Sequence, residues 1–235
     1  MDQLVKVREA YQKGLLPQKI FDLITQRFEI VTSGIQRIEK ASGASYPISY
    51  VEPSVILTGT DSVSFQYGIL FARTIPVFFE DKFQVVIQIS SPLVAFGLKG
   101  TIHAILAHEF LHYLELVSRI SKMEVVSDEL SANLFENVYA DSTRLFEPRA
   151  VFSDQALLTH ITKKFPAGFK DYKLEDKTEK LWIAKNLPAT RISLDENTVK
   201  LSAESLSKIS IDQSLLNKIK EYEERESKLR KKRLY

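Results

Sequence analysis

Residues 100–117 read GTIHAILAHEFLHYLELV, and this stretch decides the fold. It is apolar on every side of a helix apart from a few positions that carry imidazole or carboxylate groups. These positions are His103, His108, Glu109, His112 and Glu115. A helix that is apolar all round is buried inside a protein. We therefore expect the other elements to pack around this helix, which carries titratable groups into the core.

The pentapeptide HEFLH at residues 108–112 has the spacing of a metal site. His108 and His112 lie one turn apart on one face of a helix, so both imidazoles can bind one cation. Zinc accepts nitrogen ligands at about 2.0–2.1 Å and keeps a water in catalytic sites. Glu109 lies about 60° round the helix from His112 and can reach that water as a general base. His103 faces away from His112 and is expected to be a core histidine.

A third protein ligand is needed, and several carboxylates follow His112. The candidates are Glu115, Glu124, Asp128, Glu129, Glu136 and Asp141. Glu115 is only three residues on and cannot close a tetrahedron comfortably. Glu129 lies in the next predicted helix, and a short turn between antiparallel helices would bring it opposite the histidines, with Asp128 as its main rival. Asn133 follows one turn later and can accept a hydrogen bond from the outer nitrogen of a ligand histidine.

The rest of the chain predicts an α+β protein. Helices are expected over Leu4–Lys13 and from Pro17 to Ser42, and a capping box at residues 121–124 begins another that runs to about Tyr139. Residues rich in β-branched and aromatic side chains predict strands between them. The strands are Ser54–Thr58, Ser64–Ala72, Ile75–Phe79 and Phe83–Ser90.

We divide the chain into N-terminal helices (1–45), a core (46–150) and a helical C-terminal extension (151–235). The stretch from Asp212 to Tyr235 is highly charged, with five acidic residues among eight basic ones, which favours a solvated helix. Docking over the cleft as a latency device is the alternative. Charges near the N-terminus interrupt any signal-peptide core, and no apolar run is long enough to span a membrane. The expected protein is soluble and cytoplasmic.

The amino-acid composition limits the partners and the kinds of site that the chain can have. The 235 residues are 44% hydrophobic with a net charge of +2, so no strong field favours nucleic acid or an anionic membrane as a partner. No cysteine is present, which excludes disulfides, thiolate metal sites and a cysteine nucleophile. Any metal must be held by His, Asp or Glu.

The HEFLH motif together with SDELSAN at residues 127–133 resembles the gluzincin zinc metallopeptidases. Within them it is most similar to the HtpX-like and CAAX-prenyl-protease-like branch, including small soluble members called minigluzincins. That branch pairs HExxH with a downstream helix that carries ExxxD. The resemblance covers about residues 54–140.

The resemblance implies Zn²⁺ as cofactor, with residues of this chain in defined roles. The zinc ligands would be His108, His112 and Glu129, and Glu109 would be the general base. Asn133 stands where the family has Asp. An amide oxygen there still accepts a hydrogen bond from a ligand histidine, but it supports that ligand less strongly than a carboxylate would. The implied function is hydrolysis of peptide or protein substrates by a zinc-activated water, without a covalent intermediate.

The resemblance also implies a zincin-like fold, in which a small mixed sheet has an edge strand before the active-site helix. Phe83–Ser90 is the expected edge strand, and it would bind a peptide by strand addition. An oxyanion needs a cationic or hydroxyl donor, for which His160, Tyr139, Arg144 and Arg191 are candidates.

Two alternatives remain. One is a catalytically inactive zincin-fold protein that acts as a binding module, which the Asn133 departure and the lack of a clear oxyanion donor favour. The other is a helical interaction protein in which HExxH occurs by chance.

Overall fold

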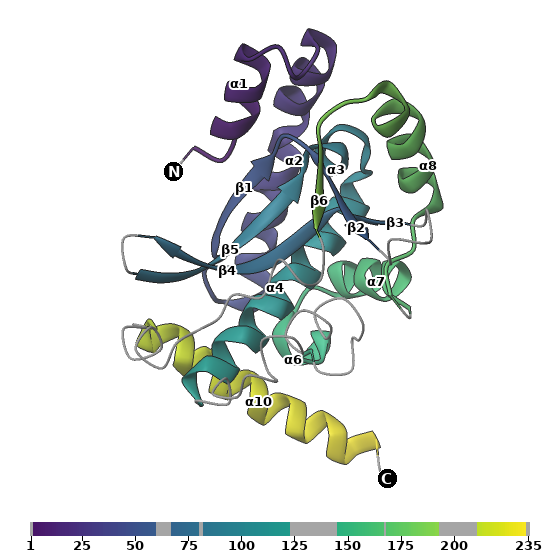
Figure 1. The fold of residues 1–235 in the computed structure, drawn as a ribbon. Helices are drawn as coiled ribbons and strands as arrows, with labels where there is room; N and C mark the ends of the chain where they lie inside the picture. Colours follow the sequence, from purple (N-terminus) through teal and green to yellow (C-terminus); the bar gives the residue numbers. More distant parts are fainter. Residues whose placement is uncertain are drawn as a thin grey trace.

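The computed structural model describes residues 2–59, 67–79, 82–122, 145–166, 168–192 and 211–233. These residues form an α+β protein, mostly helical, with two small mixed three-stranded sheets (Figure 1). The described helices are α1 (Val5–Gln12), α2 (Gln18–Ser42), α3 (Ser91–Phe96), α4 (Lys99–Ser121), α6 (Pro148–Val151), α7 (Gln155–Lys164), α8 (Tyr172–Leu181), the 3₁₀ helix η2 (Ile183–Lys185) and α10 (Gln213–Arg233). The described strands are β1 (Ile48–Glu52), β2 (Val55–Gly59), β3 (Tyr67–Leu70), β4 (Ala72–Phe79), β5 (Lys82–Ser90) and β6 (Ala189–Ile192).

The first sheet has the strand order β1-β5-β4. β1 runs parallel to β5, and β4 runs antiparallel to it. The prediction that Phe83–Ser90 is an edge strand is therefore wrong, because β5 is central. Val86 and Gln88 on one face of β5 are only 5% and 6% exposed, and Ile87 and Ile89 on the other face are fully buried, so both faces are covered. β4 is the outer strand, and no other strand in the described part of the chain pairs with its far side.

The second sheet has the order β3-β2-β6 and joins distant parts of the sequence. β6 pairs in parallel with β2, with Thr190 opposite Ile56. The C-terminal region, expected to be helical, therefore also contributes a strand, which corrects that part of the prediction. The strand is held at its start by Trp182, whose indole N–H donates to the Pro188 carbonyl at 2.9 Å.

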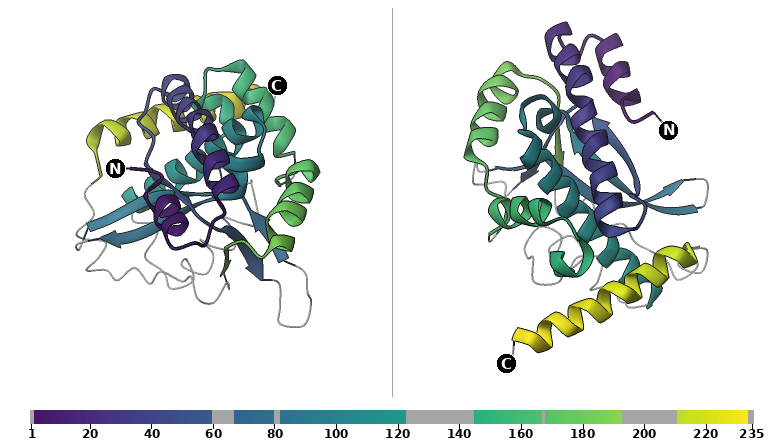
Figure 2. Two further views of the ribbon diagram at one scale, coloured as in Figure 1. Left: turned by 90° about the horizontal axis from the view of Figure 1, so that it is seen from above. Right: turned by 180° about the vertical axis from the view of Figure 1, so that it is seen from behind.

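Helices α2 and α4 pack together behind the first sheet (Figure 2). The predicted limits of α2 are confirmed: it follows Pro17 and ends at Gly43, whose φ of 76° suits glycine. The two helices approach closely at Gly34, where a Cβ atom would lie 2.8 Å from Cδ2 of His103. The predicted buried helix is confirmed as α4. Of the helix expected from residue 121 to about Tyr139, only Ser121 and Lys122 are described, and they form the end of α4; the rest lies outside the described residues.

The C-terminal helix α10 crosses the end of α4 (Figure 1). Tyr222 is fully buried, and its hydroxyl donates to the Ser42 carbonyl at 3.0 Å. Glu223 accepts hydrogen bonds from Ser118 at 2.9 Å and Lys122 at 2.6 Å. The tail forms the predicted helix, but one face of it packs on the core instead of being fully solvated.

The described segments share one hydrophobic core. Leu16, Ile105 and Trp182, which come from the three parts into which the sequence was divided, belong to the same buried cluster. None of the helices in the described ranges is long and apolar enough to cross a membrane.

Candidate metal centre and catalytic site

The two histidines of HEFLH converge. They lie on α4, whose apolar residues Phe110, Leu111 and Leu114 are at most 1% exposed, so the helix cannot turn this face to solvent. The Nε2 atoms of His108 and His112 lie 3.0 Å apart, and their rings meet at 87°. Helical spacing alone puts the two side chains on one face, and the rotamers then bring the two Nε2 atoms within hydrogen-bonding distance of each other.

This geometry fits a shared divalent ion. Two nitrogens bound to one tetrahedral zinc at about 2.0–2.1 Å would lie about 3.3 Å apart, close to the observed separation. Burial lowers the pKa of His112 to about 4, and burial together with the neighbouring His112 lowers the pKa of His108 well below its usual value. Both rings are therefore neutral near pH 7, the form that binds metal.

The predicted remainder of the site lies outside the described residues. Glu129, its rival Asp128, Asn133 and the candidate donors Tyr139 and Arg144 all fall in residues 123–144. Within the described ranges, no group of three or more His, Asp or Glu side chains is arranged to hold a metal. Of the predicted ligand set, the structure therefore describes only His108 and His112.

Glu109 faces the outer strand β4. Its side chain is 7% exposed, and its Oε2 accepts a hydrogen bond from Oγ1 of Thr74 at 2.9 Å. Burial raises the pKa of Glu109 to about 7, and the hydrogen bonds from Thr74 oppose that rise. A carboxyl group that titrates near neutrality can both accept and return a proton.

Phe165 covers the imidazole of His108. The two rings stack with centroids 3.9 Å apart and planes within 9°. Phe165 follows the last residue of α7, and its other neighbour is Phe169, at 5.4 Å. Phe165 therefore forms an aromatic wall against one face of the His108 ring.

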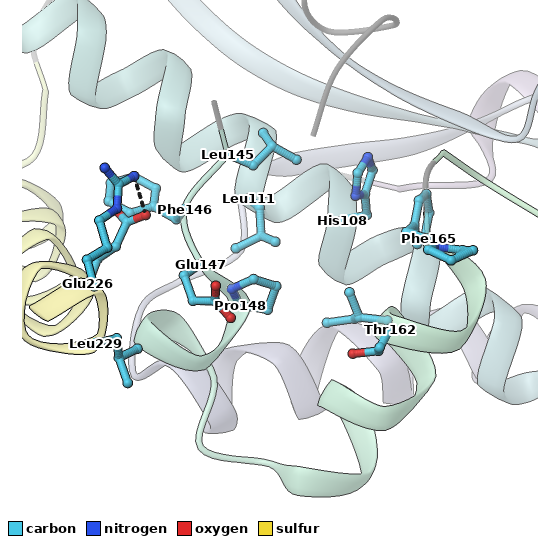
Figure 3. Close-up of a pocket in the computed structure, with 13 residues that line it drawn as sticks. His108, Leu111, Leu145, Phe146, Glu147, Pro148, Thr162, Phe165, Glu226 and Leu229 are labelled. Carbon is cyan, nitrogen blue, oxygen red and sulfur yellow. Dashed lines mark hydrogen bonds and ion pairs between the residues drawn. The ribbon is translucent and has the colours of Figure 1, made fainter. Parts of the chain in front are cut away.

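A cavity of about 380 Å³ opens beside His108. Figure 3 shows its lining, with His108 and Phe165 on one side and the α10 side chains Glu226 and Leu229 on the other. Apolar and polar side chains both line the cavity, and Glu226 forms an ion pair with Arg230 at 2.9 Å. α10 therefore forms one wall of the cavity next to the candidate metal site.

The other sequence candidates lie elsewhere. A Cβ atom at Gly100 would meet Cε1 of His160 at 3.0 Å, which places His160 near the start of α4. That point is eight residues before His108, or about 12 Å along the helix. Arg191 is exposed on β6, opposite Leu57 of β2. Neither belongs to the described lining of the cavity at His108.

His103 is a core histidine, as expected. It is 2% exposed, its Nε2 lies 3.2 Å from the Ile30 carbonyl, and its Nδ1 lies 3.4 Å from Nη1 of Arg37. Arg37 in turn binds both carboxylate oxygens of Asp154 at 2.6 and 2.8 Å. These groups connect α2, α4 and the start of α7.

Two residues of the site were missed from the sequence, Thr74 and Phe165. Nothing in a single strand or loop marks them, because their importance comes from tertiary contacts with α4.

Comparisons of the chain with known protein families, with curated proteins and with solved structures found no match. The geometry of the site is therefore the basis for assigning a function.

Proposed function

We propose that the protein is a zinc-dependent metallopeptidase of the gluzincin type. The observation that carries this proposal is the convergence of the His108 and His112 Nε2 atoms, 3.0 Å apart, on a buried helix. The carboxylate of Glu109 projects from the adjacent face of the same helix. Two neutral nitrogen donors beside a carboxyl group with a pKa near neutrality are the parts that metal-assisted hydrolysis needs.

Each residue has one task in this mechanism. His108 and His112 hold the metal, and Glu129 is the proposed third ligand. Bound zinc supplies a Lewis acid for the scissile carbonyl and lowers the pKa of water. Glu109 accepts the proton of the attacking water on a carboxylate oxygen and delivers it to the leaving amine, so no covalent intermediate forms.

The surroundings of the site suit a peptide substrate. β4 is the outer strand of its sheet among the described residues and lies against α4 at Glu109. An extended peptide beside β4 would be aligned by main-chain hydrogen bonds. The cavity beside His108, which both apolar and polar side chains line, would receive a side chain of that peptide.

Elemental analysis and a cleavage assay test the proposal together. We expect about one zinc per purified chain and cleavage of casein or a quenched peptide library that a chelator abolishes. Glu109→Gln should keep zinc and lose cleavage, while Glu115→Gln, on the same helix, serves as the matched control and keeps both. A chain without zinc would show that HExxH occurs by chance. Zinc without cleavage would favour a binding module, and cleavage by Glu109→Gln would overturn the role of the base.

The third ligand needs its own variant. Glu129→Ala should lose zinc, and Asp128→Asn should retain it, if Glu129 completes the site. The opposite result would assign the ligand to Asp128. Loss of zinc in neither variant would remove both carboxylates from the proposed site.

A further inference from the structure

One buried hydroxyl joins the outer strand to the proposed base. Oγ1 of Thr74 lies 2.9 Å from Oε2 of Glu109 and also 2.9 Å from the backbone carbonyl oxygen of Glu109. Thr74 is 5% exposed and Glu109 is 7% exposed, so water has little access to this contact. A threonine hydroxyl has a single hydrogen, which the two oxygens of Glu109 share or exchange.

We propose that Thr74 is a positioning residue that fixes the carboxylate of Glu109 for proton transfer. The inference rests on the proposed function, in which Glu109 is the general base. A glutamate side chain has several rotatable bonds, and its carboxylate can adopt many positions. With Oε2 anchored to Thr74, the carboxylate takes a defined orientation from which its other oxygen, Oε1, can accept the proton of water.

The anchor is itself rigid. Thr74 pairs with Ile87 of the central strand, and Ile87 is fully buried. Threonine is branched at Cβ, which restricts its χ1 angle. The position of the hydroxyl is therefore set by the core of the sheet, and α4 is held against β4 at this point.

No neighbouring hydroxyl takes over this role in the described site. Tyr46 lies close enough for the charge of Glu109 to raise the pKa of its phenol, in addition to the effect of burial. Its hydroxyl, however, donates to the Leu106 carbonyl at 2.9 Å. Tyr46 supports the backbone of α4, whereas Thr74 binds the carboxylate.

The placement on β4 has a second consequence. β4 is also the strand beside which the peptide is expected to lie, so the same strand would align the substrate and orient the base. An error in the position of Glu109 relative to the substrate would then lower the rate of the chemical step more than the affinity for the substrate. Displacements of about 1 Å in catalytic groups cost about 100-fold in rate.

Steady-state kinetics of the zinc-loaded full-length protein on a quenched peptide test the proposal. Thr74→Val removes the hydroxyl and keeps a similar shape. We expect it to lower kcat by about 10- to 100-fold with KM within about twofold and zinc content unchanged. Thr74→Ser restores the hydroxyl and should return kcat to within about threefold of the wild type.

Thr101→Val is the matched control, because Thr101 is also buried and donates to a carboxylate, Oδ2 of Asp171, at 2.8 Å. It should leave kcat unchanged even if it lowers the unfolding midpoint. A second readout is independent of activity: Thr74→Val should shift the unfolding midpoint less in a Glu109→Gln background than in the wild type, if the two side chains are coupled.

The outcomes separate this inference from the proposed function. If the wild type cleaves and Glu109→Gln does not, but Thr74→Val has the kcat of the wild type, only the positioning role is overturned. Equal loss of kcat in Thr74→Val and Thr74→Ser would also overturn it, because the hydroxyl would then not be the cause. A wild type without cleavage would reject the proposed function and this inference with it.

Discussion

Helix α4 carries three histidines in two contrasting environments. His103, near its start, is bonded by neighbouring elements at both ring nitrogens, by the Ile30 carbonyl and by Arg37. His108 and His112, farther along, direct their Nε2 atoms at one another, and the face of His108 is covered by Phe165. All three rings are largely removed from water, so burial does not separate the two kinds of site.

The difference lies in where the nitrogen lone pairs point. The ring of His103 has its hydrogen bonds satisfied by the fold, and it serves to join α2 to α4. The two later rings place a lone pair from each Nε2 in the same small volume, where only one proton or one metal ion can sit. Histidines on one helix can therefore be structural or metal-binding, and their partners decide which.

The largest expected effect is the loss of metal on removal of one ligand. His112→Ala takes away one of the two converging nitrogens, and zinc content should fall from about one per chain to near zero after dialysis. Elemental analysis of the purified variant measures this. His103→Ala, on the same helix, is the comparison and should keep its zinc. Equal zinc in His112→Ala and the wild type would show that the histidine pair is a hydrogen-bonded pair only.

The same His103→Ala variant should show the converse effect on stability. It removes a buried ring that packs against Gly34 and bonds to Ile30 and Arg37. The cavity and the lost hydrogen bonds should lower the free energy of unfolding by about 2–4 kcal/mol. Denaturant unfolding measures the change. A variant as stable as the wild type would contradict the structural role of His103.

The sequence predicted well what depends on local periodicity. The apolar run around HEFLH gave α4, and the spacing of residues 108–112 placed His108 and His112 on one face. The burial of His103 was also predicted, from its place on the opposite face of the helix. These features are properties of a single helix, whose geometry is independent of what packs against it.

The features that the sequence did not predict depend on contacts between separate helices and strands. The resemblance implied that Phe83–Ser90 is an edge strand, yet β1 and β4 pair with its two sides. The contact between Thr74 and Glu109 joins residues 35 positions apart. A pattern within one strand contains no information on which element will cover its other side.

The ion pair between Arg37 and Asp154, which lies beside His103, should stabilise the fold less at low pH. The Arg37 guanidinium hydrogen-bonded to Asp154 lowers the pKa of that carboxyl to about 2, below its usual value of 3.8. A lowered pKa in the folded state means that the stabilisation is present above pH 4 and is lost as the pH falls through 2. Asp154→Asn should therefore lower the free energy of unfolding by about 1–2 kcal/mol at pH 7.

The difference between the wild type and Asp154→Asn should shrink as the pH falls from 5 to 2. Unfolding curves at several pH values measure it. Asp176→Asn, whose carboxylate pairs with Lys180 at an exposed site, is the control and should have little effect at any pH. A difference between Asp154→Asn and the wild type that stays constant down to pH 2 would show that the ion pair is not its source.

The smallest effect is expected from Phe165, the aromatic wall of the proposed metal site. Phe165→Leu keeps an apolar side chain but removes the ring stacked 3.9 Å from His108. Stacking of this kind contributes about 0.5–1.5 kcal/mol, so the zinc dissociation constant should rise by about 2- to 10-fold. Competition with a chromophoric chelator measures it.

Phe21→Leu is the control. It removes a similar stack, between Phe21 and Tyr11 at 4.3 Å, which joins α1 to α2, and it should leave zinc binding unchanged. If both variants bind zinc as the wild type does, the orientation of His108 is fixed by α4 and His112 alone, and Phe165 is only a wall of the cavity.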